Sequence, residues 1–337
     1  MDRDNLFVSV LMSVYSEKPS ILEECINSIL EQTFRNFEFL IYLDKPDNEE
    51  LWSYLVKKAC QDSRIIIHRN EKNRNLAGTL NDELSVAKGD YIVRMDGDDS
   101  SAKERIAELV DYMENHPEIG VASSWMKEFG NKEPWKNKVV KYTSNYSEME
   151  LMILYQTPIA HAPCIFRKSV IENYSPIYNE KCCRTQDYDA WSRLIRNGVQ
   201  FGMVRKPLYL RRKSGDYGPK PIQFRVIHNQ IARNNVGCEL SKYNIKLPDI
   251  VNDSLLHKVH EIYKNEKGQN RKKMKTIAAI IYSTLYNNPL KMIAELLKNR
   301  DLEVPLVLPF NMMLHFLLSC SLCDINNKVT DKSQLIY

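Results

Sequence analysis

Three carboxylates stand close together in the sequence, at Asp96, Asp98 and Asp99, with Gly97 between the first two. Carboxylates this close repel one another, so a folded protein needs a reason to hold them together. A divalent cation is one such reason, because Mg²⁺ and Mn²⁺ prefer hard oxygen ligands and complete their coordination with water and substrate phosphate. Glycine would allow a sharp turn and a closely approaching ligand. The alternative is an acidic loop that caps a helix beginning near Ala102, since Asp and Ser favour helix amino termini.

The residues before this cluster alternate between buried strands and helices. Strands are predicted at residues 7–14, 37–43, 64–68 and 91–95, and helices at residues 20–30, 51–60 and 76–87. The first helix has one apolar face and opens with a capping box formed by Ser20 and Glu23. This alternation predicts an open parallel sheet with helices on both of its faces.

Polar residues follow three of these strands. Tyr15 follows the first strand, Asp44 the second, and the acidic cluster the fourth. In such sheets ligands bind outside the carboxyl ends of the strands, so these residues are predicted to meet at one site. The turn after the first strand, SVYSEKPS, has no glycine, and the chain contains no P-loop motif. A nucleotide bound at this edge would therefore need a metal ion to neutralise its phosphates.

Composition limits the classes of protein to consider. A chain of 337 residues, 43% hydrophobic and 27% charged, suits one large soluble domain or two modest ones. A net charge of +4, without a basic stripe interleaved with aromatic residues in the first 200 residues, does not favour nucleic acid as a partner. The charged amino terminus has no signal-peptide core, so a cytoplasmic location is expected. The eight cysteines are expected to be reduced thiols, and the lone CxxC at Cys320 and Cys323 does not by itself predict zinc.

The carboxy-terminal third differs in character. A predicted helix at residues 222–235 is followed by a strongly basic run at residues 264–275 and by an apolar run at residues 304–323. Two prolines interrupt the apolar run, and its uninterrupted part is too short for a membrane span. Basic residues beside amphipathic helices indicate docking on an anionic membrane surface. The alternative is a helical subdomain with a solvated basic loop.

Seven segments follow one another in a fixed order along the chain: VSVLMSVY, FEFLIYLD, NRNLAGTLNDEL, YIVRMDGDD, PIAHAPCIFRKSV, TQDYDAWSRL and PLYLRR. In this order they resemble the family 2 inverting glycosyltransferases with a GT-A fold, over about residues 7–215. The chain looks most like bacterial enzymes that build capsule, O-antigen or exopolysaccharide. The resemblance implies an α/β GT-A fold, with a Rossmann-like, mainly parallel sheet flanked by helices and a C-terminal helical extension. It implies a nucleotide-sugar-binding catalytic domain at residues 1–215 and a helical region at residues 216–337.

The resemblance also implies roles for single residues. Asp187 matches the general base that deprotonates the acceptor hydroxyl, and Asp98 with Asp96 matches the acids that hold Mn²⁺ or Mg²⁺ on the donor diphosphate. The donor is implied to be a nucleotide sugar, with UDP favoured, and the acceptor a saccharide or lipid-linked saccharide. The residues implied to bind the donor are Tyr15, Glu17, Asp44, Asn81, Asp96, Gly97, His161 and Arg211.

Several positions depart from the family pattern. Gln186 stands where the family usually has Glu beside the base, which removes a neighbouring negative charge. The turn Leu43-Asp44-Lys45-Pro46 differs from the usual sequence, which leaves the selectivity for the nucleotide base open. Asn75 replaces a usual glycine, and it is tolerable there because asparagine adopts left-handed conformations.

Several alternatives remain open. Asp189 is a second candidate for the base, and His161 taken alone suits a buried core histidine. A non-catalytic nucleotide-sugar-binding subunit is a rival function, favoured by Gln186. A nucleotidyltransferase is a second rival, but it would need a glycine-rich basic turn after the first strand.

Overall fold

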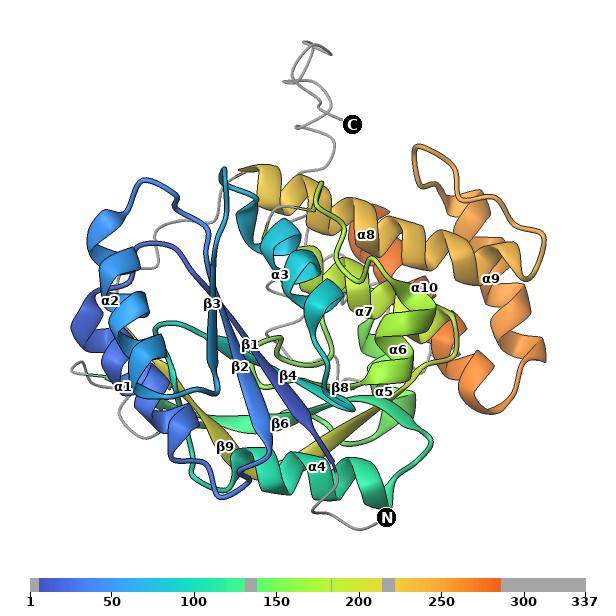
Figure 1. Ribbon diagram of the computed structural model, residues 1–337. Coiled ribbons are helices and arrows are strands. Elements are labelled where there is room, and N and C mark those ends of the chain that lie inside the picture. Colours follow the sequence, from blue (N-terminus) through green and yellow to red (C-terminus); the bar gives the residue numbers. More distant parts are fainter. Residues whose placement is uncertain (1–5, 131–137, 183, 214–221, 286–337) are drawn as a thin grey trace. The chain divides into compact units, whose positions relative to one another are not determined.

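The sheet is built around β1 (Val8–Val14), a strand of mostly apolar residues that is buried along nearly its whole length. β1 lies between β2 (Phe37–Leu43) and β4 (Tyr91–Asp96), and β3 (Ile65–Arg69) extends the sheet beyond β2. All three pairings are parallel. Strands covered by helices on both faces need such near-continuous apolar sequences. The predicted parallel sheet of residues 7–95 is confirmed (Figure 1).

The computed structural model describes residues 6–130, 138–182, 184–213 and 222–285. The chain divides into two compact units, Met1–Ile227 and His228–Tyr337. The predicted domain boundary after residue 215 falls outside the described residues and stays a prediction. The CxxC segment and the apolar run at residues 304–323 also lie outside them.

The second half of the sheet is mixed. It continues through β8 (Ile165–Arg167), β6 (Ile119–Phe129), β9 (Gln200–Arg212) and the short β5 (Ser100–Ser101), while β7 (Val139–Val140) pairs with β6. β6 and β9 are parallel, whereas β8 runs antiparallel to β4 and to β6. The mainly parallel sheet flanked by helices agrees with the predicted fold class (Figure 1).

β9 is a single strand that is irregular in its middle, although Pro207 divides its sequence into two strand-like runs, 199–204 and 208–212. Pro207 pairs with Trp125 at the point where the register with β6 shifts. Proline has no N–H for the ladder and is tolerated at such an irregularity, so it interrupts the strand pattern in the sequence without ending the strand.

Helices flank the sheet in the first unit. They are α1 (Pro19–Leu30), α2 (Glu49–Gln61), α3 (Asn75–Val86), α4 (Arg105–Asn115), α5 (Tyr146–Met152), α6 (Lys168–Tyr174) and α7 (Gln186–Arg196). The predicted capping box of α1 is wrong: Lys18 is the N-cap, without a side-chain hydrogen bond, and Pro19 fills the first position. Proline suits that position because its missing N–H would have no intrahelical partner there. Asn75 opens α3 with a φ of 55°, the left-handed conformation expected of it.

The second unit is helical in its described part. α8 (Ile222–Ser241) leads into it, and α9 (Asp253–Asn265) and α10 (Gly268–Leu285) follow. Apolar side chains on α9 and α10 are buried: Leu255, Leu256, Val259, Tyr263, Met274, Ile277 and Ile281. Asn252 caps α9 by accepting a 3.0 Å hydrogen bond from the Leu255 N–H. Among the helices described, none combines the length and apolarity needed to cross a bilayer.

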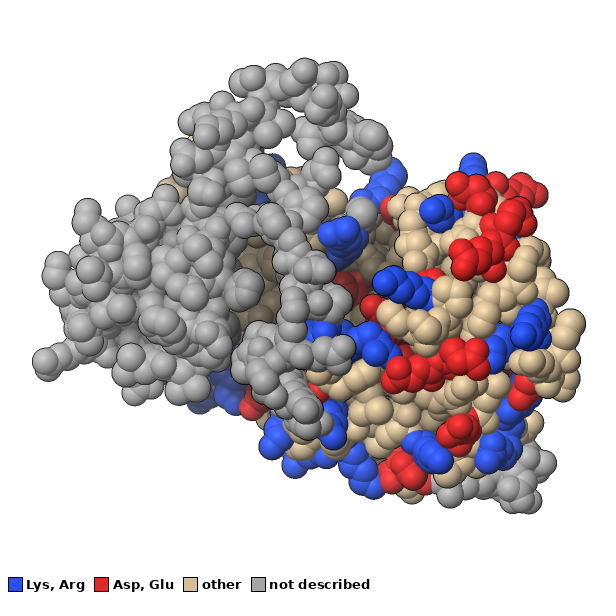
Figure 2. All heavy atoms as spheres, turned by 90° about the vertical axis from the view of Figure 1, so that its left-hand side faces the viewer, with Lys and Arg blue, Asp and Glu red and all other residues tan. Residues whose placement is uncertain are grey.

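Acidic and basic side chains intermingle on the side of the molecule that Figure 2 shows. Ion pairs join neighbouring elements here, such as Lys58 on α2 with Glu23 on α1 and Arg69 on β3 with Glu49 on α2. The acidic side chain of each pair is exposed, and pairs near the surface contribute little to the free energy of folding.

Glu83 on α3 is a fully buried carboxyl group in the first unit. Its Oε1 accepts a 3.1 Å hydrogen bond from the Ser13 hydroxyl at the end of β1, and its Oε2 has no hydrogen-bond partner among the described residues. Burial raises the pKa of Glu83 well above its ordinary value, because a charge is poorly solvated in the interior. The folded state therefore keeps a proton that the unfolded chain loses.

This difference in bound protons makes the free energy of unfolding depend on pH. Above the unfolded pKa of glutamate the folded chain binds one proton more, so Glu83 should lower the unfolding free energy by about 1.4 kcal/mol per pH unit as pH rises toward its folded pKa. We expect Glu83→Gln to remove this decline, measured by urea unfolding between pH 5.5 and pH 8.5. Glu49→Gln is the control, because Arg69 lowers the pKa of Glu49 and its contribution is flat in that range. Equal pH profiles for wild type and Glu83→Gln would contradict the prediction.

Candidate functional site

The three carboxylates of the predicted metal site meet at the end of β4. Carboxylate oxygens of Asp96, Asp98 and Asp99 all lie within 4.8 Å of one another. The cluster does not cap α4, because β5 intervenes and the N-cap of α4 is Glu104, which makes no side-chain cap hydrogen bond. The helix-cap alternative is therefore wrong. Repulsion within the cluster has to be offset by other groups.

The three acids differ in their surroundings. Asp98 is exposed and Asp96 is partly exposed, whereas Asp99 is only 3% exposed. Partial desolvation of the Asp98 carboxylate raises its pKa, and the charge of Asp96 raises it further. Burial and the two neighbouring charges raise the pKa of Asp99 to about 8. A cation at this position would offset the repulsion, and Asp96 and Asp98 are the pair placed to hold it.

Gly97 lies against the loop that follows β1. A Cβ atom on Gly97 would come within 3.0 Å of Val14 Cγ1 and 3.4 Å of Glu17, so a larger residue would push this loop away. Glu17 accepts a 2.6 Å hydrogen bond from the Tyr15 N–H. Burial raises the pKa of Glu17, and the charge of Asp98 adds to the shift. The structure thus brings Glu17 and Gly97 beside the acidic cluster.

The ends of β1 and β2 are followed by two contrasting residues of the predicted site. Tyr15 is 45% exposed, and Lys45 Nζ lies 5.8 Å from the centroid of its ring. Asp44 is buried, and its Oδ1 accepts hydrogen bonds from Asn70 Nδ2 (2.8 Å) and the Arg74 N–H (2.6 Å). Its N–H donates to the Val14 carbonyl, so it lies directly beside β1. Tyr15 therefore offers a surface for stacking, and Asp44 is fixed in place behind it.

Asn81 and His161 both hold Tyr178. The Asn81 amide donates to the Tyr178 carbonyl (2.8 Å) and accepts from its N–H (3.0 Å). His161 Nε2 lies 2.7 Å from the Tyr178 hydroxyl, and its ring meets Trp191 edge-on. Burial lowers the pKa of His161 well below its ordinary value, so the ring is neutral near pH 7. In this structure both residues pack and position the chain around Tyr178.

The two candidate bases on α7 have different partners. Asp187 is partly exposed in the first turn and accepts a 2.8 Å hydrogen bond from the Tyr188 N–H. Asp189 accepts a 2.8 Å hydrogen bond from Arg193 Nε in an ion pair one turn along the helix. The carboxylate of Asp189 is thus engaged by a cation. Burial raises the pKa of Tyr178, and the charge of Asp187 contributes to that shift, which places Asp187 near the same buried cluster.

Arg211 lies near the end of β9 and contacts a buried acid. It pairs with Glu128, its register partner on β6, whose side chain is only 2% exposed. Lys213 Nζ lies 3.3 Å from the same carboxylate. Glu128 is a residue that sequence reasoning missed, although an acid among the apolar residues of a buried strand signals a partner.

Two buried arginines lie beneath the acidic cluster. Arg94 on β4 pairs with Asp96. Arg105 is fully buried and donates to the Ser101 hydroxyl (2.9 Å), the Arg94 carbonyl (2.6 Å) and the Ala162 carbonyl (3.1 Å). Sequence reasoning missed both, although an arginine inside the apolar run YIVRM is a signal of a buried charge pair.

Comparison with known proteins identifies the family. The family model for glycosyl transferase family 2 matches residues 9–175. A glycosyltransferase of Methanocaldococcus jannaschii, itself uncharacterized, is 32% identical over 210 residues, covering 61% of this chain and 70% of the relative. The chain belongs to glycosyl transferase family 2. It is a glycosyltransferase, so the rival functions of a non-catalytic subunit and a nucleotidyltransferase lose their support.

Further comparisons give lower sequence identities. The Escherichia coli UDP-Gal:alpha-D-GlcNAc-diphosphoundecaprenol beta-1,3-galactosyltransferase is 28% identical over 218 residues, covering 62% of this chain and 74% of that enzyme. Residues 1–349 of Staphylococcus aureus TarS, crystallised with UDP-GlcNAc, share the fold with a TM-score of 0.54 and 14% identity, over 95% of this chain and 92% of the fragment. The chain spans 54% of the longer TarS structure. The mannosyltransferase PcManGT of Pyrobaculum calidifontis, in complex with GDP-Man and Mn²⁺, has a TM-score of 0.51 and 16% identity, over 95% of this chain and 87% of that chain.

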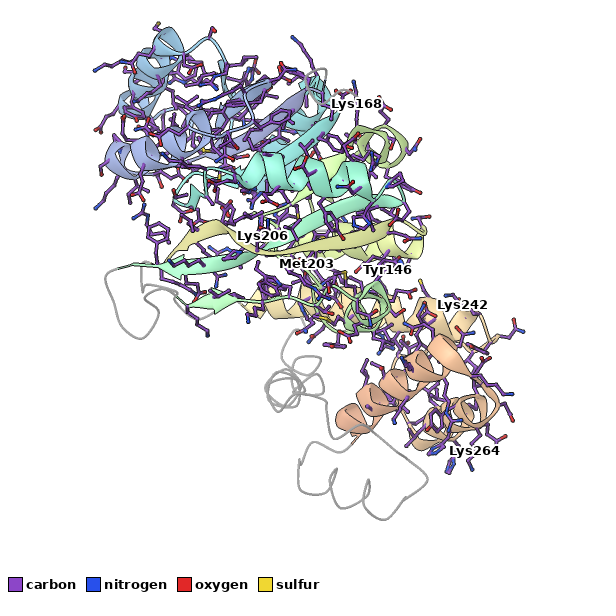
Figure 3. All side chains as sticks on the ribbon, turned by 90° about the horizontal axis from the view of Figure 1, so that it is seen from below. Tyr146, Lys168, Met203, Lys206, Lys242 and Lys264 are labelled. Atoms are coloured by element: carbon purple, nitrogen blue, oxygen red, sulfur yellow. The ribbon has the colours of Figure 1, made fainter. Side chains whose placement is uncertain are left out.

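A cavity of about 580 Å³ lies elsewhere, between α4 and β9. Met203 and Lys206 line it, and Figure 3 shows both on β9. None of the predicted site residues lines this cavity.

Proposed function

We propose that this family 2 enzyme transfers a sugar, with inversion, from a nucleotide-diphosphate sugar to a hydroxyl group of a saccharide or lipid-linked saccharide. The observation that carries the proposal is the acidic cluster at the end of β4, where Asp96 and Asp98 are accessible and Asp99 is buried. UDP is the favoured nucleotide, because the E. coli relative is named for UDP-Gal and TarS was crystallised with UDP-GlcNAc. The same E. coli name supports a lipid-linked acceptor in polysaccharide biosynthesis.

The chemistry needs few groups. An inverting transfer is a single displacement at the anomeric carbon, with one base on the acceptor side and no covalent nucleophile. Mn²⁺ or Mg²⁺, when bound, would neutralise charge on the leaving diphosphate. Asp96 and Asp98 would hold that ion, and Tyr15 and Asp44 would bind the base of the nucleotide. Asp187 would take the proton from the acceptor hydroxyl.

A donor panel tests the proposal. Purified full-length protein is incubated with UDP-, GDP- and other nucleotide sugars and Mn²⁺, and release of nucleoside diphosphate is measured with and without EDTA. We expect release from one donor class, lost with EDTA and with Asp98→Ala. Asp249→Ala, an exposed acid in the second unit, is the control and should behave as wild type. Release that persists in EDTA and in Asp98→Ala would contradict metal-dependent transfer.

The proposal that Asp187 is the general base predicts different losses of kcat for two isosteric variants. Asp187→Asn should lower kcat by about 10²–10⁴-fold, the range for a lost general base, while the Kd for UDP stays unchanged. Asp189→Asn should lower kcat less than about tenfold, because that carboxylate pairs with Arg193. Calorimetry with UDP and a turnover assay with the identified donor separate binding from catalysis. A large loss in Asp189→Asn with an active Asp187→Asn would reverse the assignment.

We also propose that the second unit docks on the anionic cytoplasmic surface of a membrane. Basic side chains at the end of α9 and the start of α10 are exposed: Lys264, Lys267, Arg271 and Lys272. Basic residues at a helix amino terminus oppose the helix dipole, so an anionic surface would relieve an unfavourable arrangement. Each lysine near an anionic membrane contributes about 1 kcal/mol.

Vesicle binding tests this docking. Changing Lys264, Lys267 and Lys272 to Gln should weaken binding to phosphatidylglycerol vesicles at least about tenfold, since the attraction is additive and screened by salt. The control changes Lys242, Lys246 and Lys258 to Gln, an equal charge change in the same unit (Figure 3 labels Lys242 and Lys264). Equal losses in the two triple variants would show a diffuse charge effect. No binding by wild type would refute docking.

A further inference from the structure

A set of hydrogen bonds attaches the end of β9 to residues 96–99, which we call the metal loop. The Tyr209 hydroxyl donates to Asp99 Oδ2 (2.7 Å) and accepts from the Asp96 N–H (3.2 Å). The Arg212 N–H donates to Asp99 Oδ1 (2.6 Å), and Arg212 Nε donates to the Asp98 carbonyl (2.9 Å). β5, the short strand that follows the loop, pairs with β9 at Leu210 and Tyr209. The loop is thus held on both sides by one strand.

These hydrogen bonds distinguish Asp99 from the other two carboxylates of the loop. Each oxygen of Asp99 accepts a hydrogen bond from β9, and the side chain is buried. Asp98 is exposed and Asp96 partly exposed. The hydroxyl of Tyr209 contacts the backbone of one prospective ligand and the side chain of the buried acid. Removal of this single oxygen would therefore delete two of the hydrogen bonds between β9 and the loop.

Resting on the proposed metal-dependent function, we infer that Tyr209 is a positioning residue for the metal loop and that Asp99 is its link to β9, not a metal ligand. Tyr209 is fully buried, and its ring packs under the Arg105 guanidinium, whose carbon lies 4.8 Å from the ring centroid. The phenol oxygen is fixed by this packing. Groups that orient metal ligands in this way commonly change metal affinity by about 10–100-fold when removed.

Tyr209→Phe tests the inference, because it deletes the hydroxyl and keeps the ring. The matched control is Tyr91→Phe. Tyr91 is also buried, and it begins β4, at the end away from the acidic cluster. Its hydroxyl forms hydrogen bonds with Glu114 and with Arg167 (2.8 Å). The Kd for Mn²⁺ is measured from the electron paramagnetic resonance signal of free Mn²⁺, with the full chain and saturating UDP. Thermal unfolding of each variant is measured alongside.

We expect Tyr209→Phe to weaken Mn²⁺ binding about tenfold and Tyr91→Phe to leave it unchanged, at similar losses of melting temperature. Mn²⁺ binding by Tyr209→Phe equal to that of wild type would overturn the inference, as would an equal weakening in Tyr91→Phe. Failure of the wild type to bind any Mn²⁺ would refute the proposed metal dependence itself and the inference with it.

A second pair of variants tests the role of Asp99. Asp99→Asn keeps an oxygen for the Arg212 N–H and an amide that can donate to the Tyr209 hydroxyl, so Mn²⁺ affinity should fall by less than about threefold, whereas Asp98→Asn should lower it more than about thirtyfold. An equal loss in the two variants would show that Asp99 is a ligand. This result would overturn its assignment as a link.

Discussion

The mutual repulsion of three carboxylates at the end of β4 is the constraint that the surrounding groups of this site have to offset. Their oxygens lie within 4.8 Å of one another, and burial would strengthen the repulsion at Asp99. Each acid has its own compensation. Arg94 pairs with Asp96, the Tyr209 hydroxyl and the Arg212 N–H donate to Asp99, and Asp98 is left exposed. The cluster is stable as a structure only because groups from β4 and β9 meet around it.

Buried arginines make this arrangement rigid. Arg105 spans the interior between β5, β4 and the segment before β8, where it donates to Ser101, to the Arg94 carbonyl and to the Ala162 carbonyl. Burial lowers the pKa of Arg105 to about 10, yet it stays protonated at pH 7. A buried charge is tolerated when its donors are satisfied, and its removal would leave carbonyl groups without partners. Arg105 thus fixes the segments on either side of the metal loop.

The opposite side of the site is fixed by neutral groups. Asn81 and His161 converge on Tyr178 from different parts of the chain, and Trp191 on α7 packs against the His161 ring. These contacts tie α3, the segment before β8 and the helix that carries Asp187 to one tyrosine. The proposed base and the proposed metal pair are therefore carried by elements that are each anchored in the interior. Catalytic groups need such support, since small displacements are costly to rate.

The sequence by itself determined most of the local elements and predicted an acidic site. Apolar runs at residues 8–14, 37–43 and 91–95 predicted buried parallel strands, and the acids after them predicted a metal site. Both signals are local, because they depend only on the residue types at neighbouring positions. The tertiary structure decided which groups compensate those acids. Tyr209 lies 113 residues from Asp96 in the chain, and Pro207 obscures the strand that carries it. The pairing of β9 with β5 and β6 brings its side chains to the loop, and such long-range contacts depend on the packing of the whole sheet and leave no periodic signal in the local sequence.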